Sequence, residues 1–244
     1  MTLYIIGIGL ESEKDISING LEAAQSSSEI YLENYTSILQ VQKEKLEKFC
    51  GKKIILANRD LIENKFTKII ISAKEKNISL LVPGSPLAAT THIAIFQEAR
   101  LNKIPVEVID SSSILTAVGI TGLELYKFGR TASIPFNNKD VKTPIQILEQ
   151  NQKINLHTLF LLDLAPKEKK YLSIKQAINY LIENKVSKNE KALACARLGC
   201  KNFVIKSGTL EELKNKNYGK PPYCLIIPSK KLHFIEEEMF SLWK

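Results

Sequence analysis

The sequence opens with Leu3-Tyr4-Ile5-Ile6-Gly7-Ile8-Gly9-Leu10, an apolar run that ends in two glycines separated by one residue. We interpret residues 3–8 as a buried β-strand and the glycines as the tight turn that follows it. Because glycine lacks a side chain, a ligand can approach the backbone of such a turn closely. Open α/β sheets bind their ligands at turns of this kind, at the carboxyl ends of their strands. The stretch therefore predicts an α/β fold whose functional site begins at this turn.

The glycine pattern alone does not identify the ligand. A dinucleotide-binding turn continues as G-x-G-x-x-G, whereas Ser12 occupies the third glycine position here. The G-x-x-x-x-G-K-[ST] motif is absent, which excludes a P-loop enzyme. An ordinary tight turn remains the alternative interpretation of these two glycines.

The composition indicates a soluble globular protein. The 244 residues suffice for one large domain or two smaller ones, and 44% of them are hydrophobic while 25% are charged. No apolar run approaches the length of a membrane span, and the first residues do not resemble a secretory signal, so we expect a cytoplasmic protein without a membrane partner. The net charge of +8 comes mainly from lysines. In segments such as residues 41–48 they alternate with glutamates, which favours a solvated helix face over a nucleic-acid-binding surface, although such a surface can still attract an acidic protein.

The cysteines and histidines do not form a metal-binding pattern. No two cysteines have C-x-x-C spacing, and no histidine lies at ligand spacing from a cysteine. We therefore predict no metal site, and we interpret the cysteines as core or incidental residues in a reducing compartment. The residues concerned are Cys50, Cys195, Cys200, Cys224, His92, His157 and His233.

Short apolar runs alternate with amphipathic ones, which favours parallel strands joined by crossover helices. In the first half we expect strands at residues 3–8, 29–32, 53–56, 79–82 and 105–109, and helices at 17–24, 66–73 and 87–99. After the serine cluster at 111–113 we expect strands at 131–134, 158–162, 192–196 and 224–227, and helices from 114 and at 145–149, 174–182, 210–213 and 234–243. The pattern predicts two α/β domains, 1–110 and 111–244, with a cleft between them.

A second turn could line the same pocket as the first. Pro83-Gly84-Ser85-Pro86 follows a predicted strand, and its two prolines favour a rigid turn. Ser85 either contacts a ligand or caps the next helix, and His92, on the first turns of that helix, is either a base or a packing residue. Asp163, at the end of a predicted strand, either binds a ligand or caps the next element. No G-x-S-x-G motif supports a hydrolase.

Taken together, these segments resemble the diphthine synthase family of tetrapyrrole-methylase-like (class III) methyltransferases. The strings P-L-x-A-T-T-H and A-V-G-x-T-G-L-x-x-Y-x-F-G carry the most specific part of the resemblance. The matching segments are residues 3–10, 13–16, 31–37, 82–92, 113–114, 117–123, 126–129, 157–159, 162–163, 196–197 and 221–222.

The resemblance implies an enzyme that takes methyl groups from S-adenosylmethionine and releases S-adenosylhomocysteine, with the cofactor in a cleft between two α/β domains. It implies a homodimer, and as substrate elongation factor 2 bearing a histidine extended by an aminocarboxypropyl group. The amino nitrogen of that group would be methylated repeatedly in diphthamide biosynthesis, to the trimethylammonium product or a further methylated form. The cofactor contacts implied by the resemblance are Leu10, Ser85, Ala88, Ser113, Ile114, Leu162, Leu198 and Tyr223.

The chain departs from the family pattern at several places. Ser85 stands where the family typically has aspartate, Leu198 where a smaller residue is familiar, and Tyr223 where a histidine can occur. Residues 137–143 are short where relatives often carry a longer loop with a tryptophan.

Methyl transfer from an activated donor needs mainly alignment of the acceptor and exclusion of water, so we expect no dedicated nucleophile. The amine must still lose a proton, and Glu33, His92 and Asp163 are the unranked candidates for a base. The alternatives are a class III methyltransferase that acts on a corrinoid precursor or ribosomal RNA, a non-catalytic relative that has lost the cofactor, and, more remotely, a nucleotide-binding oxidoreductase.

Overall fold

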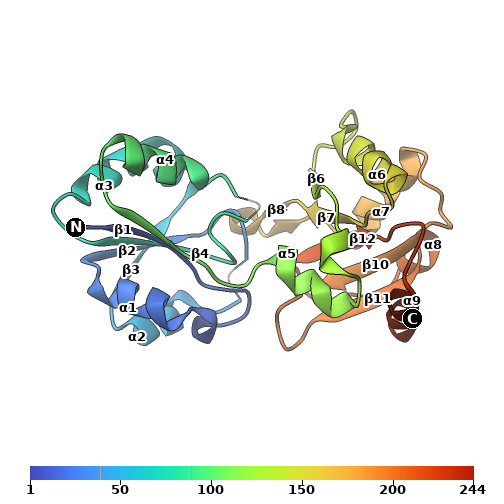
Figure 1. Cartoon of the computed structure of the whole chain (residues 1–244), viewed down its shortest axis with the longest axis horizontal. Helices are drawn as coiled ribbons and strands as arrows, with labels where there is room; N and C mark the ends of the chain where they lie inside the picture. The colour runs from blue at the N-terminus through green and yellow to red at the C-terminus, as the bar shows by residue number, and fades with distance from the viewer. Residues whose placement is uncertain (39, 89) are drawn as a thin grey trace. The chain divides into compact units, whose positions relative to one another are not determined.

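The computed structural model describes residues 1–38, 40–88 and 90–244, which fall into two compact units. Unit 1 is Met1–Leu115 and unit 2 is Thr116–Lys244. Both are α/β structures, which confirms the predicted fold class (Figure 1). The domain limits 1–110 and 111–244 remain a prediction from the sequence.

Unit 1 contains a five-stranded parallel sheet in the order β3-β2-β4-β1-β5, as the alternating pattern predicts. Its helices cover both faces of the sheet, with α3 and α4 on one face and α1 and α2 on the other (Figure 1). The strands are β1 (Leu3–Gly7), β2 (Glu29–Glu33), β3 (Ile54–Ala57), β4 (Ile78–Val82) and β5 (Val106–Ile109). The helices are α1 (Ile18–Ser26), α2 (Lys43–Cys50), α3 (Phe66–Ser72) and α4 (Ile93–Leu101).

The first strand is apolar throughout because both of its faces are buried. Leu3 and Ile5 pack with the helices on one side, whereas Ile6 and Ile8 pack with those on the other. A strand buried on both faces shows a continuous apolar run instead of alternation. This explains why residues 3–8 decide the fold.

The helix predicted over residues 87–99 is wrong at its start, since α4 begins at Ile93 and His92 precedes it. Ser85 is not its N-cap: its hydroxyl donates to the Asp110 carboxylate. The Thr90 hydroxyl donates to the Pro86 carbonyl at 2.7 Å, and such local bonds compete with helical pairing. Ala89, which the predicted helix included, lies outside the described residues.

Unit 2 contains a five-stranded sheet in the order β11-β10-β12-β7-β6, in which only β6 and β7 pair in parallel. The parallel arrangement that the alternation favours is therefore wrong for most of this sheet: β11 follows β10 after a loop too short for a crossover helix, and β12 runs antiparallel to both β10 and β7. The strands are β6 (Ala132–Ile134), β7 (Thr158–Leu162), β10 (Lys191–Ala196), β11 (Val204–Thr209) and β12 (Tyr223–Ile227), with a small hairpin of β8 (Leu164–Ala165) and β9 (Lys170–Tyr171). The helices are α6 (Thr143–Lys153), α7 (Ile174–Glu183), α8 (Leu210–Leu213) and α9 (Phe234–Leu242), and the short α5 (Ile114–Ala117) lies at the boundary of the units.

A buried polar cluster attaches α9 to unit 2. The Glu236 carboxylate is fully buried and accepts hydrogen bonds from the Glu124 and His233 backbone amides, at 3.0 and 2.8 Å, and from the Lys127 ammonium. His157 Nδ1 accepts from the Ser229 amide at 2.9 Å, so its Nε2 is the atom that carries the proton and donates to Glu236 Oε1 at 2.8 Å. Burial lowers the pKa of His157, which keeps the ring neutral.

All four cysteines are buried, which confirms their interpretation as core residues, and none forms a disulfide among the described residues. Cys195 on β10 lies directly opposite Cys224 on β12. The hydrogen bond with the Cys224 thiol, together with burial, raises the pKa of Cys195. Over the described ranges we found no cluster of three metal-ligating side chains and no helix long and apolar enough to cross a bilayer.

Candidate functional site

The two glycine turns of unit 1 are joined by their backbones. The Gly9 amide donates to the Gly84 carbonyl at 3.3 Å, and the Gly84 amide donates to the Gly9 carbonyl at 2.8 Å. Both residues have positive φ, +70° and +82°, which glycine adopts without strain. A Cβ on Gly7 would lie 2.7 Å from the Gly84 carbonyl oxygen, so the turns approach closely only because side chains are absent.

Asp15 fixes the loop that follows β1. Its Oδ2 atom accepts from the backbone amides of Leu10, Glu11 and Ser12, at 3.2, 2.7 and 3.3 Å. The Ser111 hydroxyl donates to the Asp15 carbonyl at 2.9 Å and so connects this loop to the one after β5. The sequence places Asp15 only near a helix start, and its role as organiser of the loop was missed.

Five of the predicted cofactor contacts lie at the carboxyl edge of the unit 1 sheet. The order β4-β1-β5 makes the loops after these three strands neighbours. Above Gly84 there is room: a Cβ built there would meet only the Leu10 side chain at 3.8 Å and the Ser112 carbonyl at 3.9 Å. The loops thus form a shelf with a main-chain floor, which we call the unit 1 shelf. The five residues are Leu10, Ser85, Ala88, Ser113 and Ile114.

The other three predicted contacts meet at one edge of the unit 2 sheet. Leu162 ends β7, and Tyr223 begins the antiparallel β12 beside it and opposite Ala196. Leu198 follows β10 by two residues and is buried. The buried Arg197 holds this edge together, since its guanidinium donates to the Asn202 and Tyr218 carbonyls, at 2.9 and 3.2 Å.

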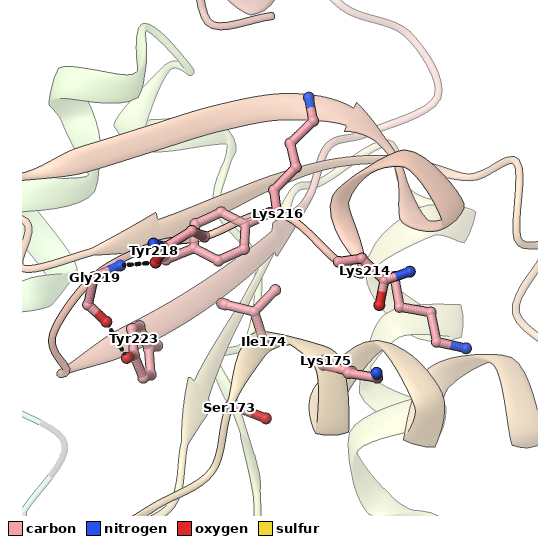
Figure 2. A pocket seen from close by; sticks show the side chains of 10 residues that line it. Ser173, Ile174, Lys175, Lys214, Lys216, Tyr218, Gly219 and Tyr223 are labelled. Carbon is pink, nitrogen blue, oxygen red and sulfur yellow. Dashed lines mark hydrogen bonds between the residues drawn. The ribbon is translucent and has the colours of Figure 1, made fainter.

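A pocket of about 390 Å³ lies within unit 2, between the start of α7, the segment after α8 and Tyr223 (Figure 2). The Tyr223 hydroxyl donates to the Gly219 carbonyl and closes one wall. Of the predicted cofactor contacts only Tyr223 lines it. Among the described residues that line it, three are lysines and none is acidic, so the pocket suits an anion better than a cationic methyl donor. The lining residues are Ser173, Ile174, Lys175, Lys214, Asn215, Lys216, Asn217, Tyr218, Gly219 and Tyr223.

The three candidate bases differ in their surroundings. Glu33 is fully buried, and its carboxylate accepts from the Tyr35 amide and from the Thr36 amide and hydroxyl. His92 is buried with its ring edge-on to Tyr35 at 6.4 Å; burial lowers its pKa, against the opposing effect of the Glu33 charge. Asp163 accepts from the Phe136 amide at 3.0 Å and from the Leu164 amide at 2.9 Å, so it connects the loop after β6 to the end of β7, and its predicted role in ligand binding stays a prediction. Glu33 and His92 thus lie near each other in unit 1, whereas Asp163 belongs to unit 2.

Comparison with known proteins identifies the family. Residues 2–214 match the model for tetrapyrrole (corrin/porphyrin) methylases. The diphthine methyl ester synthase of Schizosaccharomyces pombe is 38% identical over 98% of this chain and 93% of its own length, and the diphthine synthase of Archaeoglobus fulgidus is 41% identical over 97% and 93%. A crystal structure of diphthine synthase, 37% identical, superposes with a TM-score of 0.94 and covers 100% of this chain and 96% of its own.

These similarities extend over nearly the whole chain and confirm the resemblance seen in the motifs. They favour neither a corrinoid or ribosomal RNA methyltransferase nor a cofactor-free relative. The protein is therefore a member of the tetrapyrrole methylase family of methyltransferases, within the group of the diphthine synthases.

Proposed function

We propose that the protein transfers methyl groups from S-adenosylmethionine to the amino nitrogen of an aminocarboxypropyl-histidine on elongation factor 2, as a step of diphthamide biosynthesis in the cytoplasm. The observation that carries this proposal is the unit 1 shelf, where the paired glycine turns form a main-chain floor and a carbon atom added at Gly84 would meet Leu10 and Ser112 only at van der Waals distance. The relatives' names support a role in forming diphthine, and elongation factor 2 as the acceptor is what the family resemblance implies. The cleft expected between the two domains stays a prediction.

The residues of the unit 1 shelf fit the proposed donor. When bound, the donor supplies a methyl group that its sulfonium already activates. The protein then has to hold the donor, align the amine and exclude water, and orientation alone can lower such a barrier by roughly 7–11 kcal/mol. The Leu10 side chain provides an apolar wall, and the backbone around Gly84 and Ser112 provides polar atoms. We propose that Leu162, Leu198 and Tyr223 of unit 2 complete the donor's surroundings.

The carboxylates support a mechanism without a dedicated nucleophile. The carboxylates of Glu33 and Asp163 accept hydrogen bonds from backbone amides, so each already positions a loop of the protein. We expect Asp163→Asn to slow turnover and weaken donor binding together, because the loop at Phe136 loses an acceptor. A variant of Glu33 or Asp163 that abolishes turnover while donor affinity stays intact would contradict this mechanism.

The test of the proposed function is mass spectrometry of the elongation factor peptide after incubation with this protein and S-adenosylmethionine. We expect the extended histidine to gain one CH₂ unit for each methyl group transferred. The relatives' names differ by a methyl ester, and fragment masses separate methylation of the amine from that of the carboxylate. Methyl transfer to a corrinoid precursor or ribosomal RNA instead, or no heat of donor binding in calorimetry, would reject the proposal.

We propose that the protein is a homodimer that buries an apolar surface of unit 2. Leu125 and Tyr126, exposed to 45% and 80%, adjoin the exposed Ile235 through the contacts of Glu236 with Glu124 and Lys127. Leu125→Glu with Ile235→Glu should convert the dimer to a monomer in sedimentation equilibrium, since charges are costly in an apolar interface. Ile154→Glu, which changes another exposed isoleucine elsewhere in unit 2, is the control and should leave the assembly state unchanged. A monomeric unmodified protein would refute the dimer.

The lysine-lined pocket offers a contact for acidic residues of the protein substrate. For Lys175 and Lys214 no ion pair occurs within the described part of the chain, so both charges are available. Lys175→Glu with Lys214→Glu should raise the KM for elongation factor roughly ten-fold, more strongly at low salt, with donor affinity unchanged. Lys45→Glu with Lys48→Glu on α2 is the matched control. An equal effect of both pairs would show that only the total charge matters.

A further inference from the structure

A carboxylate stands at the rim of the unit 1 shelf. Asp110 is the first residue after β5 and is exposed. The Ser85 hydroxyl, in the loop after β4, donates to its Oδ1 atom at 2.8 Å. Since β4 and β5 lie on either side of β1, this hydrogen bond crosses the end of β1, next to the paired glycine turns.

The neighbouring carboxylates are already occupied. Asp15 accepts three backbone amides with one oxygen atom, and Glu33 is buried and holds the turn at Thr36. For Asp110, the Ser85 hydroxyl accounts for one oxygen, and no hydrogen bond to Oδ2 occurs among the described residues. Asp110 is therefore placed by its own neighbour while retaining an acceptor oxygen that a ligand can use.

The chemistry of the donor matches such an acceptor. An ionised carboxylate accepts hydrogen bonds and donates none, so it selects hydroxyl or ammonium groups. S-adenosylmethionine carries a ribose diol and an α-ammonium group, and hydrogen bonds from such groups to a charged acceptor are stronger than neutral ones. The sulfonium adds a further positive charge that the carboxylate attracts.

We infer that Asp110 binds a hydroxyl or ammonium group of the methyl donor and that Ser85 is the positioning residue that orients its carboxylate. The inference rests on the proposed function, because it assigns a ligand to the same shelf. It also accounts for Ser85, which stands where the family resemblance leads one to expect an aspartate. The negative charge is supplied by Asp110 in the loop after β5, whose carboxylate accepts a hydrogen bond from Ser85.

The test measures binding by calorimetry, independently of turnover, with S-adenosylhomocysteine and 5′-methylthioadenosine as probes. Asp110→Asn should weaken binding of S-adenosylhomocysteine roughly ten-fold or more, and Ser85→Ala by a smaller factor. The exchange variant Ser85→Asp with Asp110→Asn should recover most of the affinity, because it returns a carboxylate to the same place. Asp140→Asn, at an exposed position of unit 2, is the control and should bind like the unmodified protein.

The second probe lacks the amino acid part of the donor but keeps its ribose. Equal weakening of both probes by Asp110→Asn assigns the carboxylate to the ribose hydroxyls, and weakening of S-adenosylhomocysteine alone assigns it to the ammonium group. Unchanged affinity of Asp110→Asn, or an exchange variant that binds no better than Asp110→Asn although it melts like the unmodified protein, would overturn the inference and leave the proposed function standing. No binding of either probe to the unmodified protein would reject both.

Discussion

Gly9→Ala is expected to abolish measurable binding of the methyl donor and to destabilise the protein by about 2–5 kcal/mol. Gly9 has φ +70°, and a Cβ there would lie 2.3 Å from the Cβ of Asp15. The left-handed backbone costs a non-glycine residue about 1–2 kcal/mol, and forced overpacking adds about 1–3 kcal/mol. Asp15 cannot move away cheaply, because its carboxylate holds the amides of Leu10 to Ser12.

Gly51→Ala separates the two contributions. Gly51 has nearly the same φ, +71°, but a Cβ there would meet no atom within 4 Å. It should therefore lose only the backbone part, about 1–2 kcal/mol in urea unfolding, and bind the donor normally. Equal losses of stability in the two variants, or unchanged donor affinity in Gly9→Ala, would show that the Asp15 contact does not shape the unit 1 shelf.

Glu236→Ala is expected to cost about 3–5 kcal/mol of unfolding free energy, because it leaves the buried His157 without its acceptor and removes the closest carboxylate partner of the Lys127 ammonium. It also removes the acceptor of the Glu124 and His233 amides, which attach α9. Glu237→Ala, at an exposed position on the same helix, is the control and should change stability by less than about 0.5 kcal/mol. Similar midpoints for the two variants in urea unfolding would contradict the structural role of this cluster.

The same carboxylate predicts a pH dependence. Burial opposes ionisation of Glu236, but the hydrogen bonds from Lys127, Glu124, His233 and His157 outweigh it and lower its pKa from 4.5 to about 2. Its stabilising contribution is therefore complete above pH 4.5 and is lost as the pH falls toward 2, a loss of up to about 3 kcal/mol. Glu236→Gln should flatten the unfolding free energy over that pH range, and a curve parallel to that of the unmodified protein would refute the assignment.

The sequence predicts best those elements whose signal is local. The strands of unit 1 are recognisable because burial on both faces makes them continuously apolar, as in residues 3–8. By contrast, β11 escapes notice because Lys206 and Gly208 interrupt its apolar pattern. The start of α4 is mispredicted: the helix begins at Ile93, and the Thr90 hydroxyl, which donates to the Pro86 carbonyl, lies before it.

The candidate site likewise combines residues that local motifs reveal with contacts that form only in the folded chain. The motifs lead to residues that the structure brings to one sheet edge in each unit, such as Leu10 with Ser85 and Leu162 with Tyr223. The pairing of Ser85 with Asp110 could not be predicted, because the two are 25 residues apart and meet only once β4 and β5 take their places beside β1. Which oxygen of Asp15 holds the first loop is likewise a property of the folded chain.

The reciprocal hydrogen bonds between Gly9 and Gly84 have a consequence for protein engineering. A recess whose base consists of peptide groups keeps its shape when surrounding side chains are exchanged, so its rim can be redesigned without rebuilding what lies beneath. A library that varies Leu10, Ser85, Ala88 and Asp110 while preserving the glycines should therefore yield folded variants with altered preference among bulkier sulfonium analogues.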